Sequence, residues 1–145
     1  MNIFEYFRDD DKRVKELAAE IVEHYADWPQ DRVFESVKRL IEAVQKHMTR
    51  VETLLLTRFN ENDPEMESVM ARWNTKKAEI KEIIDGLVMI HVDEPGFEDT
   101  LMRLSKLIDN LARFDKEELY PKVEECASEK DLSTMNKNFQ TEMQR

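Results

Sequence analysis

Apolar residues recur at alternating steps of three and four along most of the chain, the spacing that keeps them on one face of an α-helix. Four long stretches show this pattern, spanning residues 4–28, 33–59, 66–91 and 97–122. A shorter stretch follows Ser128, with apolar positions at Leu132, Met135, Phe139 and Met143. The pattern predicts an all-α protein, an up-down-up-down four-helix bundle with a short fifth helix at the C-terminal end.

Prolines and glycines mark the connections between these stretches. The four prolines fall at nearly even spacing, at Pro29, Pro64, Pro95 and Pro121. Asp31 after Pro29 and Asp63 before Pro64 are expected to cap the second and third helices, and Pro121 to disturb the last turns of the fourth. Only two glycines are present, too few for the many tight turns of a sandwich or barrel. We expect a single domain over residues 1–145.

Each long stretch carries one polar residue on its apolar face, near the middle of its length: Asp11, His47, Lys77 and Asp115. Scattered surface charge would not place one such residue on every helix. We expect the four to meet in a buried polar network, in which Asp11 and Asp115 neutralise Lys77. Two alternatives remain: Lys77 can reach water along its flexible stem, and Asp11 can belong to a solvated acidic run.

The charge balance restricts the choice of partner. The chain has 22 basic and 32 acidic residues, a formal net charge of −10, which argues against nucleic acid or an anionic membrane surface. No apolar run is long enough to span a bilayer, the single cysteine cannot form an internal disulfide, and no leader pattern opens the chain. We expect a cytoplasmic protein, monomer or homodimer, with a protein partner and an exposed apolar strip beside the fifth helix.

A family resemblance extends over most of the chain. It is carried by residues 3–21, 38–59, 75–87 and 107–125, and most specifically by the Glu-Leu-Tyr-Pro string at 118–121. They resemble the helices of the hemerythrin-like, or HHE cation-binding, domains, which are four-helix bundles that hold a non-haem di-iron site. The resemblance places the family's first Asp-His pair on Asp10 and Asp11. Its other ligand positions fall on His47, Val51, Trp73, Lys77, Leu111 and Asp115.

Several of these positions hold residues that cannot bind iron. The resemblance leaves His47 and Asp115 as ligands and replaces one histidine by Asp11. Val51 and Leu111 have no donor atom, and a cationic Lys77 repels metal ions. The sequence therefore predicts that the di-iron site has been lost.

Two functions are consistent with this eroded site. The first is a non-enzymatic interaction or sensory module that has no cofactor. The alternative is a protein that senses or binds oxygen or iron through a single or partial iron site. Its candidate ligands are Asp11, His47, Glu52 and Asp115. A di-iron oxidase or peroxidase is the weakest hypothesis, so no enzymatic activity is expected.

Overall fold

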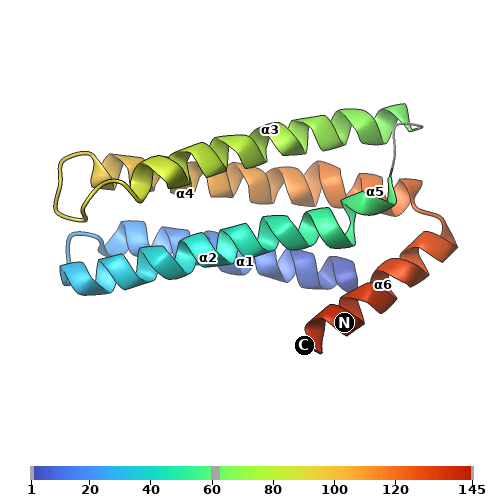
Figure 1. The fold of residues 1–145 in the computed structure, drawn as a ribbon, viewed down its shortest axis with the longest axis horizontal. Helices are drawn as coiled ribbons and strands as arrows, with labels where there is room; N and C mark the ends of the chain where they lie inside the picture. Colours follow the sequence, from blue (N-terminus) through green and yellow to red (C-terminus); the bar gives the residue numbers. More distant parts are fainter. Residues whose placement is uncertain (1, 60–62, 145) are drawn as a thin grey trace.

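The computed structural model describes residues 2–59 and 63–144, and over these residues the protein is all-α, with five helices and no strand (Figure 1). The predicted fold class is confirmed. The helices are α1 (Ile3–His24), α2 (Gln30–Leu54), α3 (Pro64–Leu87), the continuous run of α4 (Phe97–Phe114), η2 (Asp115–Leu119) and α5 (Tyr120–Cys126), and α6 (Glu129–Met143). A short 3₁₀ turn, η1 (Leu56–Arg58), follows α2.

Local sequence signals account for most helix starts. The side chains of Asn2 and Asp63 accept backbone N–H groups of the first turns of α1 and α3, and Ser128 forms a reciprocal capping box with Asp131 at the start of α6. The expected cap at Asp31 is wrong. Pro29 occupies the cap position of α2, and Asp31 lies in the first turn, where its charge suits the helix dipole.

The last long helix contains one turn of π-helix. In η2 the N–H of Tyr120 donates to the carbonyl oxygen of Asp115, five residues earlier. Pro121 directly follows and has no N–H to donate, so an α-turn would be interrupted at this point. The widened turn brings Asp115 and Tyr120 to the same inner face of the bundle, where both are buried.

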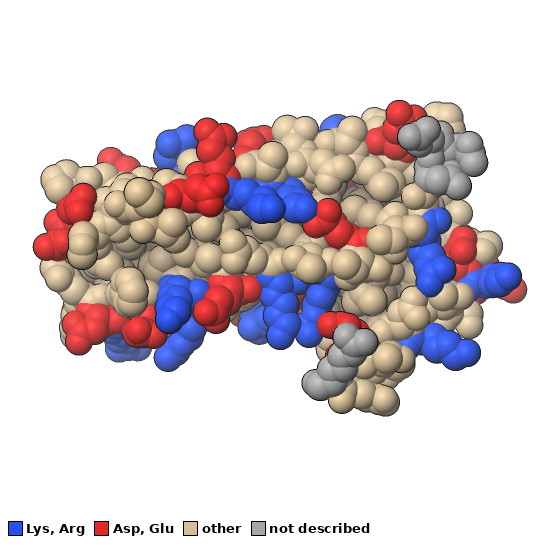
Figure 2. All heavy atoms as spheres, viewed as in Figure 1, with Lys and Arg blue, Asp and Glu red and all other residues tan. Residues whose placement is uncertain are grey.

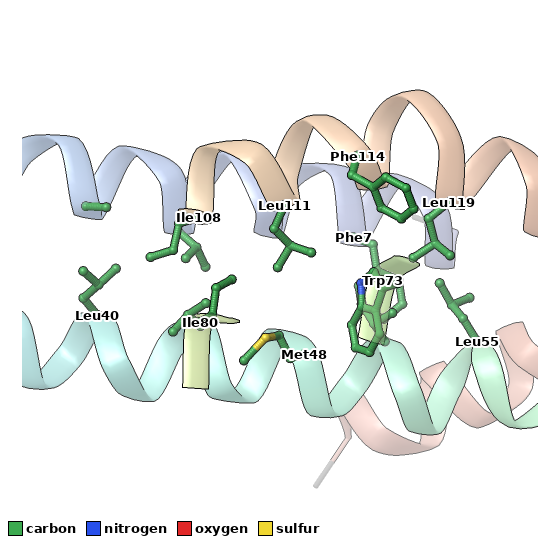
Figure 3. Close-up of a cluster of buried hydrophobic side chains, with 14 of the residues drawn as sticks. Phe7, Leu40, Met48, Leu55, Trp73, Ile80, Ile108, Leu111, Phe114 and Leu119 are labelled. Carbon is green, nitrogen blue, oxygen red and sulfur yellow. The ribbon is translucent and has the colours of Figure 1, made fainter. Parts of the chain in front are cut away.

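Packing joins the four long helices along their apolar faces. The backbones of α2 and α1, of α1 and α4, and of α4 and α3 lie close together, whereas the α2–α3 seam is the most open. The helix α6 crosses one end of the bundle against α1 and α2 (Figure 1). Most of the predicted inward positions are buried, and Figure 3 shows part of this core, with Leu40, Ile80 and Ile108 in one region and Phe7, Trp73 and Leu119 in another.

No helix among the described residues is long and apolar enough to cross a membrane.

Candidate metal centre

Four buried polar or charged residues lie inside the described part of the bundle: Asp10, Asp11, His47 and Asp115. They come from α1, α2 and η2, and the buried hydroxyl of Tyr120 on α5 joins them. The structure thus brings together three of the residues that the sequence singled out, Asp11, His47 and Asp115. Of the two further members, Asp10 was placed at a ligand position only by the family resemblance, and Tyr120 was not expected in the cluster.

Both ring nitrogens of His47 face carboxylates. Nδ1 lies 2.8 Å from Oδ2 of Asp10, and Nε2 lies 2.9 Å from Oδ1 of Asp11 and 3.2 Å from Oδ2 of Asp115. Phe7 packs edge-on against the imidazole, with 5.8 Å between ring centroids. The orientation of the ring is therefore fixed by Asp10 on one side and by Asp11 and Asp115 on the other.

The hydroxyl of Tyr120 closes the cluster from the α5 side. It hydrogen-bonds to Oδ2 of Asp11, and it lies 3.3 Å from Oδ2 of Asp115. Phe7 stacks on its ring at 6.0 Å. Because a phenol has one O–H to donate, it can serve only one of these carboxylates at a time.

Asp10 connects the cluster to the surface. Its second oxygen, Oδ1, accepts a hydrogen bond of 2.7 Å from the guanidinium of Arg13, which is itself largely exposed. Asp10 is therefore paired on both sides, by an imidazole within the core and by a guanidinium at its edge.

Burial and the neighbouring charges determine the protonation of the cluster. Burial disfavours the charged form of His47, but hydrogen bonds to Asp10 and Asp11 outweigh it, and the pKa of His47 is raised well above its usual value. Burial, followed by the charge of Asp11, raises the pKa of Asp115 to about 8. Burial also raises the pKa of the Tyr120 phenol. At neutral pH these shifts favour the charged form of His47 and the protonated form of Asp115.

Asp10 behaves in the opposite way. Burial raises its pKa, yet the hydrogen bonds from His47 and Arg13 together exceed that effect, and the net result is a lowered pKa. Asp10 is therefore the firmly ionised partner of His47.

Two buried polar atoms have no hydrogen-bond partner among the described residues, Oδ1 of Asp115 and Nε1 of Trp73. A carboxylate oxygen that is deeply buried and unpaired is unusual, because desolvation is then uncompensated. Oδ1 of Asp115 is thus available for a further partner within the cluster.

The expected position of Lys77 in this network is wrong. Lys77 forms an ion pair with Glu52 between α3 and α2, and its side chain is 23% exposed. No hydrogen bond or ion pair that the structure describes joins Lys77 to Asp11, His47 or Asp115. The long lysine stem reaches the rim of the bundle, which is the snorkelling alternative.

The same pair removes Glu52 from the candidate ligands. Its carboxylate is engaged by Lys77 at the rim, and its side chain is 37% exposed. Glu52 directly follows Val51, which is fully buried. At this level of α2 it is therefore the Val51 side chain that points into the core.

The donor set suits one metal ion and does not suit two. One ligand atom from each of Asp11, His47 and Asp115 lies within 4.8 Å of the other two. At three of the other positions that the family resemblance implies, the buried side chains are Val51, Trp73 and Leu111, which offer no ligand atom. A di-iron site needs about twice as many donors as these three residues supply.

The hydrophobic pattern gave only weak signals for Asp10 and Tyr120. Asp10 lies three residues after Phe7 and four before Val14, so the helical steps admit either Asp10 or Asp11 on the inner face. Tyr120 lies five residues after Asp115, a step that an α-helical pattern does not contain but a π-turn does.

Comparison with known proteins identified no relative: no family model, curated protein or solved structure matches this chain.

Proposed function

We propose that this protein is a non-enzymatic cation-binding module that holds a single divalent metal ion between Asp11, His47 and Asp115. The observation that carries the proposal is the close approach of three donor atoms in a buried site. Nε2 of His47 lies 2.9 Å and 3.2 Å from one oxygen of each aspartate. Neighbouring ligands bound at about 2.1 Å to an octahedral ion are about 3 Å apart.

The outer carboxylate supports this proposal. Asp10 faces Nδ1 of His47 at 2.8 Å and so holds the Nδ1–H tautomer, which leaves the lone pair of Nε2 for a metal ion. Metal-binding histidines usually have such a partner, and Asp10 has the lowered pKa that this role requires.

The charge of the cluster also favours a bound cation. Three aspartates surround one histidine, and Arg13 neutralises the cluster only from its exposed edge. An ion would replace the protons on Nε2 and Asp115, and it would engage the unpaired Oδ1 of Asp115. Bound iron or manganese would supply redox or oxygen-binding chemistry, and zinc would supply a structural crosslink.

The resemblance to hemerythrin-like domains agrees with this assignment. In this interpretation the chain keeps the bundle and one of two metal positions, while Val51, Trp73 and Leu111 occupy the other. A protein with one ion enclosed by packed side chains is better suited to sensing or to structural binding than to turnover. We therefore assign it a sensory or interaction role.

A second candidate is a module that binds no metal. Its support is that the cluster is nearly complete in hydrogen bonds: both nitrogens of His47 and the hydroxyl of Tyr120 already have carboxylate partners. In that case the protons on His47 and Asp115 take the place of the cation, and the bundle serves as an acidic protein-binding module.

Metal content separates the two candidates. The protein is purified without chelator and analysed by mass spectrometry, and the chelator-treated protein is titrated calorimetrically with Fe²⁺, Mn²⁺ and Zn²⁺. We expect one equivalent of one of these ions. Binding should be abolished in Asp115→Asn and weakened about 10- to 100-fold in Asp10→Asn, because the outer carboxylate orients the ligand.

Glu52→Gln is the matched control, since Glu52 is an acidic residue of α2 that points to the rim. It should bind the ion as the unchanged protein does, and all variants should keep their helical circular dichroism. Loss of binding in Glu52→Gln would overturn the three-ligand assignment. Absence of any saturable binding by the unchanged protein would leave the metal-free candidate.

A further inference from the structure

Among the described residues, three of the four exposed large hydrophobic side chains lie at the end of the bundle that carries the α3–α4 connection, and the fourth is Met102 on α4. Phe34 is 56% exposed, and Val88 and Met89 are more exposed still. The sequence suggested an apolar strip beside α6, but no large hydrophobic residue of α6 that the structure describes is fully exposed, and Met135 and Phe139 are buried. Figure 2 shows uncharged surface over this end of α2 and α3, with charged side chains along its edges.

Phe34 stands between two hollows of the surface. One has a volume of about 400 Å³ and runs from Asp31 to the turn at 88–93, and the other, of about 320 Å³, lies over Val37, Lys38 and Ile41. Phe34, Val88 and Ile90 line both hollows. The second hollow is lined mainly by apolar side chains, whereas the first also has polar ones. A projecting aromatic side chain beside an apolar hollow is the shape of a surface that can receive a copy of itself.

The charges around Phe34 have the same self-complementary arrangement. Asp31 and Lys38 lie on the Phe34 side of α2, three residues before it and four residues after it. Both are exposed, and neither side chain forms an ion pair or hydrogen bond with another described residue. A two-fold axis perpendicular to α2 near Phe34 therefore places the Asp31 of each copy opposite the Lys38 of the other.

We propose that this surface, formed by Asp31, Phe34, Lys38 and Val88, is the interface of a symmetric homodimer. Each Phe34 enters a hollow of the other copy, and two Asp31–Lys38 pairs flank the aromatic centre. The occupant is a second copy of this chain because a basic peptide would satisfy Asp31 but leave Lys38 unpaired. A generic apolar ligand would leave both charges without a partner.

Sedimentation velocity from micromolar to millimolar concentration tests the proposal. The unchanged protein should show a concentration-dependent dimer, and Phe34→Asp should weaken self-association by at least about tenfold, as loss of a central aromatic residue does. Met102→Asp is the matched control, because Met102 is 48% exposed and lines neither hollow. A chain that stays monomeric throughout, or one weakened equally by both substitutions, would contradict the interface.

Charge exchange gives a test specific to two copies of one chain. Asp31→Lys alone sets two lysine side chains against each other across each flank of the interface, and Lys38→Asp alone sets two aspartates together, so each variant should associate weakly. An equimolar mixture of the two variants relieves both repulsions by pairing unlike charges across the axis and should form a heterodimer. Failure of the mixture to associate better than either variant would show that these charges do not meet.

Discussion

His47 is the residue around which the buried cluster is organised. Its two nitrogens face three carboxylates, so removing any one carboxylate changes the hydrogen bonds of the same ring. Removing the partner of a buried charge lowers the free energy of unfolding by more than an exposed ion pair contributes, because the buried charge cannot be hydrated instead. Residues in the cluster and residues at the rim should therefore differ sharply in their effect on stability.

Asp11→Ala and Lys77→Met measure this difference. In metal-free protein, Asp11→Ala should lower the free energy of unfolding by about 3–5 kcal/mol, since it leaves His47 and Tyr120 short of a buried partner. Lys77→Met should change it by less than about 1 kcal/mol, because it breaks a partly exposed pair with Glu52. Urea unfolding followed by circular dichroism gives both values. Equal losses in the free energy of unfolding for the two variants would indicate that Lys77 does interact with the buried cluster.

The sequence pattern identified three members of this cluster, but it also placed Lys77 in it, which was wrong. Asp11, His47 and Asp115 could be predicted because each interrupts an apolar helical face. Lys77 interrupts such a face in the same way, yet its length lets it leave the core, a freedom that an aspartate or histidine does not have. Spacing alone therefore cannot tell a buried charge from one that reaches the rim.

Cys126 provides a pH-dependent test away from the cluster. Burial, followed by the neighbouring Asp63, raises the pKa of its thiol to about 11. At pH 8 only about one thiol in a thousand is then a thiolate, and alkylation by iodoacetamide should be slow and rise about tenfold per pH unit up to about pH 10. Asp63→Asn keeps a capping residue for α3 and should increase the rate. A rate that levels off near pH 8.5 would contradict this environment.

At the scale of elements, the run α4–η2–α5 shows how one turn determines what the core contains. The π-turn adds a residue between the inner faces of α4 and α5, so that Asp115 and Tyr120 are both buried. The helices themselves were predictable, since their apolar periodicity extends over many turns. The π-turn was not, because the sequence marks only the disturbance at Pro121, and either a kink or a widened turn relieves it.

Deletion of Lys116 tests the role of this turn. Lys116 is exposed within η2, and its removal leaves only enough residues for an α-turn, which rotates α5 by about 100° relative to α4. Either Asp115 or Tyr120 must then leave the core, and we expect a loss of several kcal/mol in the free energy of unfolding. Lys116→Ala removes the same side chain without the rotation and should change stability by less than about 0.5 kcal/mol. Similar melting temperatures for the two variants would argue against the turn's importance.

At the scale of the whole molecule, the two ends of the bundle have different surfaces. One end is covered by α6, whose Met135 and Phe139 are buried and whose Asn136 side chain accepts the N–H of Ile3 at 3.0 Å. The other end exposes Phe34, Val88 and Met89 and is where the proposed dimer forms. The fifth helix could be predicted from the spacing of its apolar residues after Ser128. Which end of the bundle stays uncovered depends on where that helix folds back, and the sequence pattern does not determine this.

The contact between Ile3 and Asn136 also brings both ends of the described chain to one side of the molecule (Figure 1). Phe34 lies 20 residues before the last residue of α2, so about 30 Å of helix separates that side from the Phe34 surface. A fluorophore, affinity tag or fused protein attached at either terminus would therefore extend away from the Phe34 surface. In a two-fold assembly, labels on the two copies would lie at opposite extremes of an elongated particle, so energy transfer between them would report its overall length.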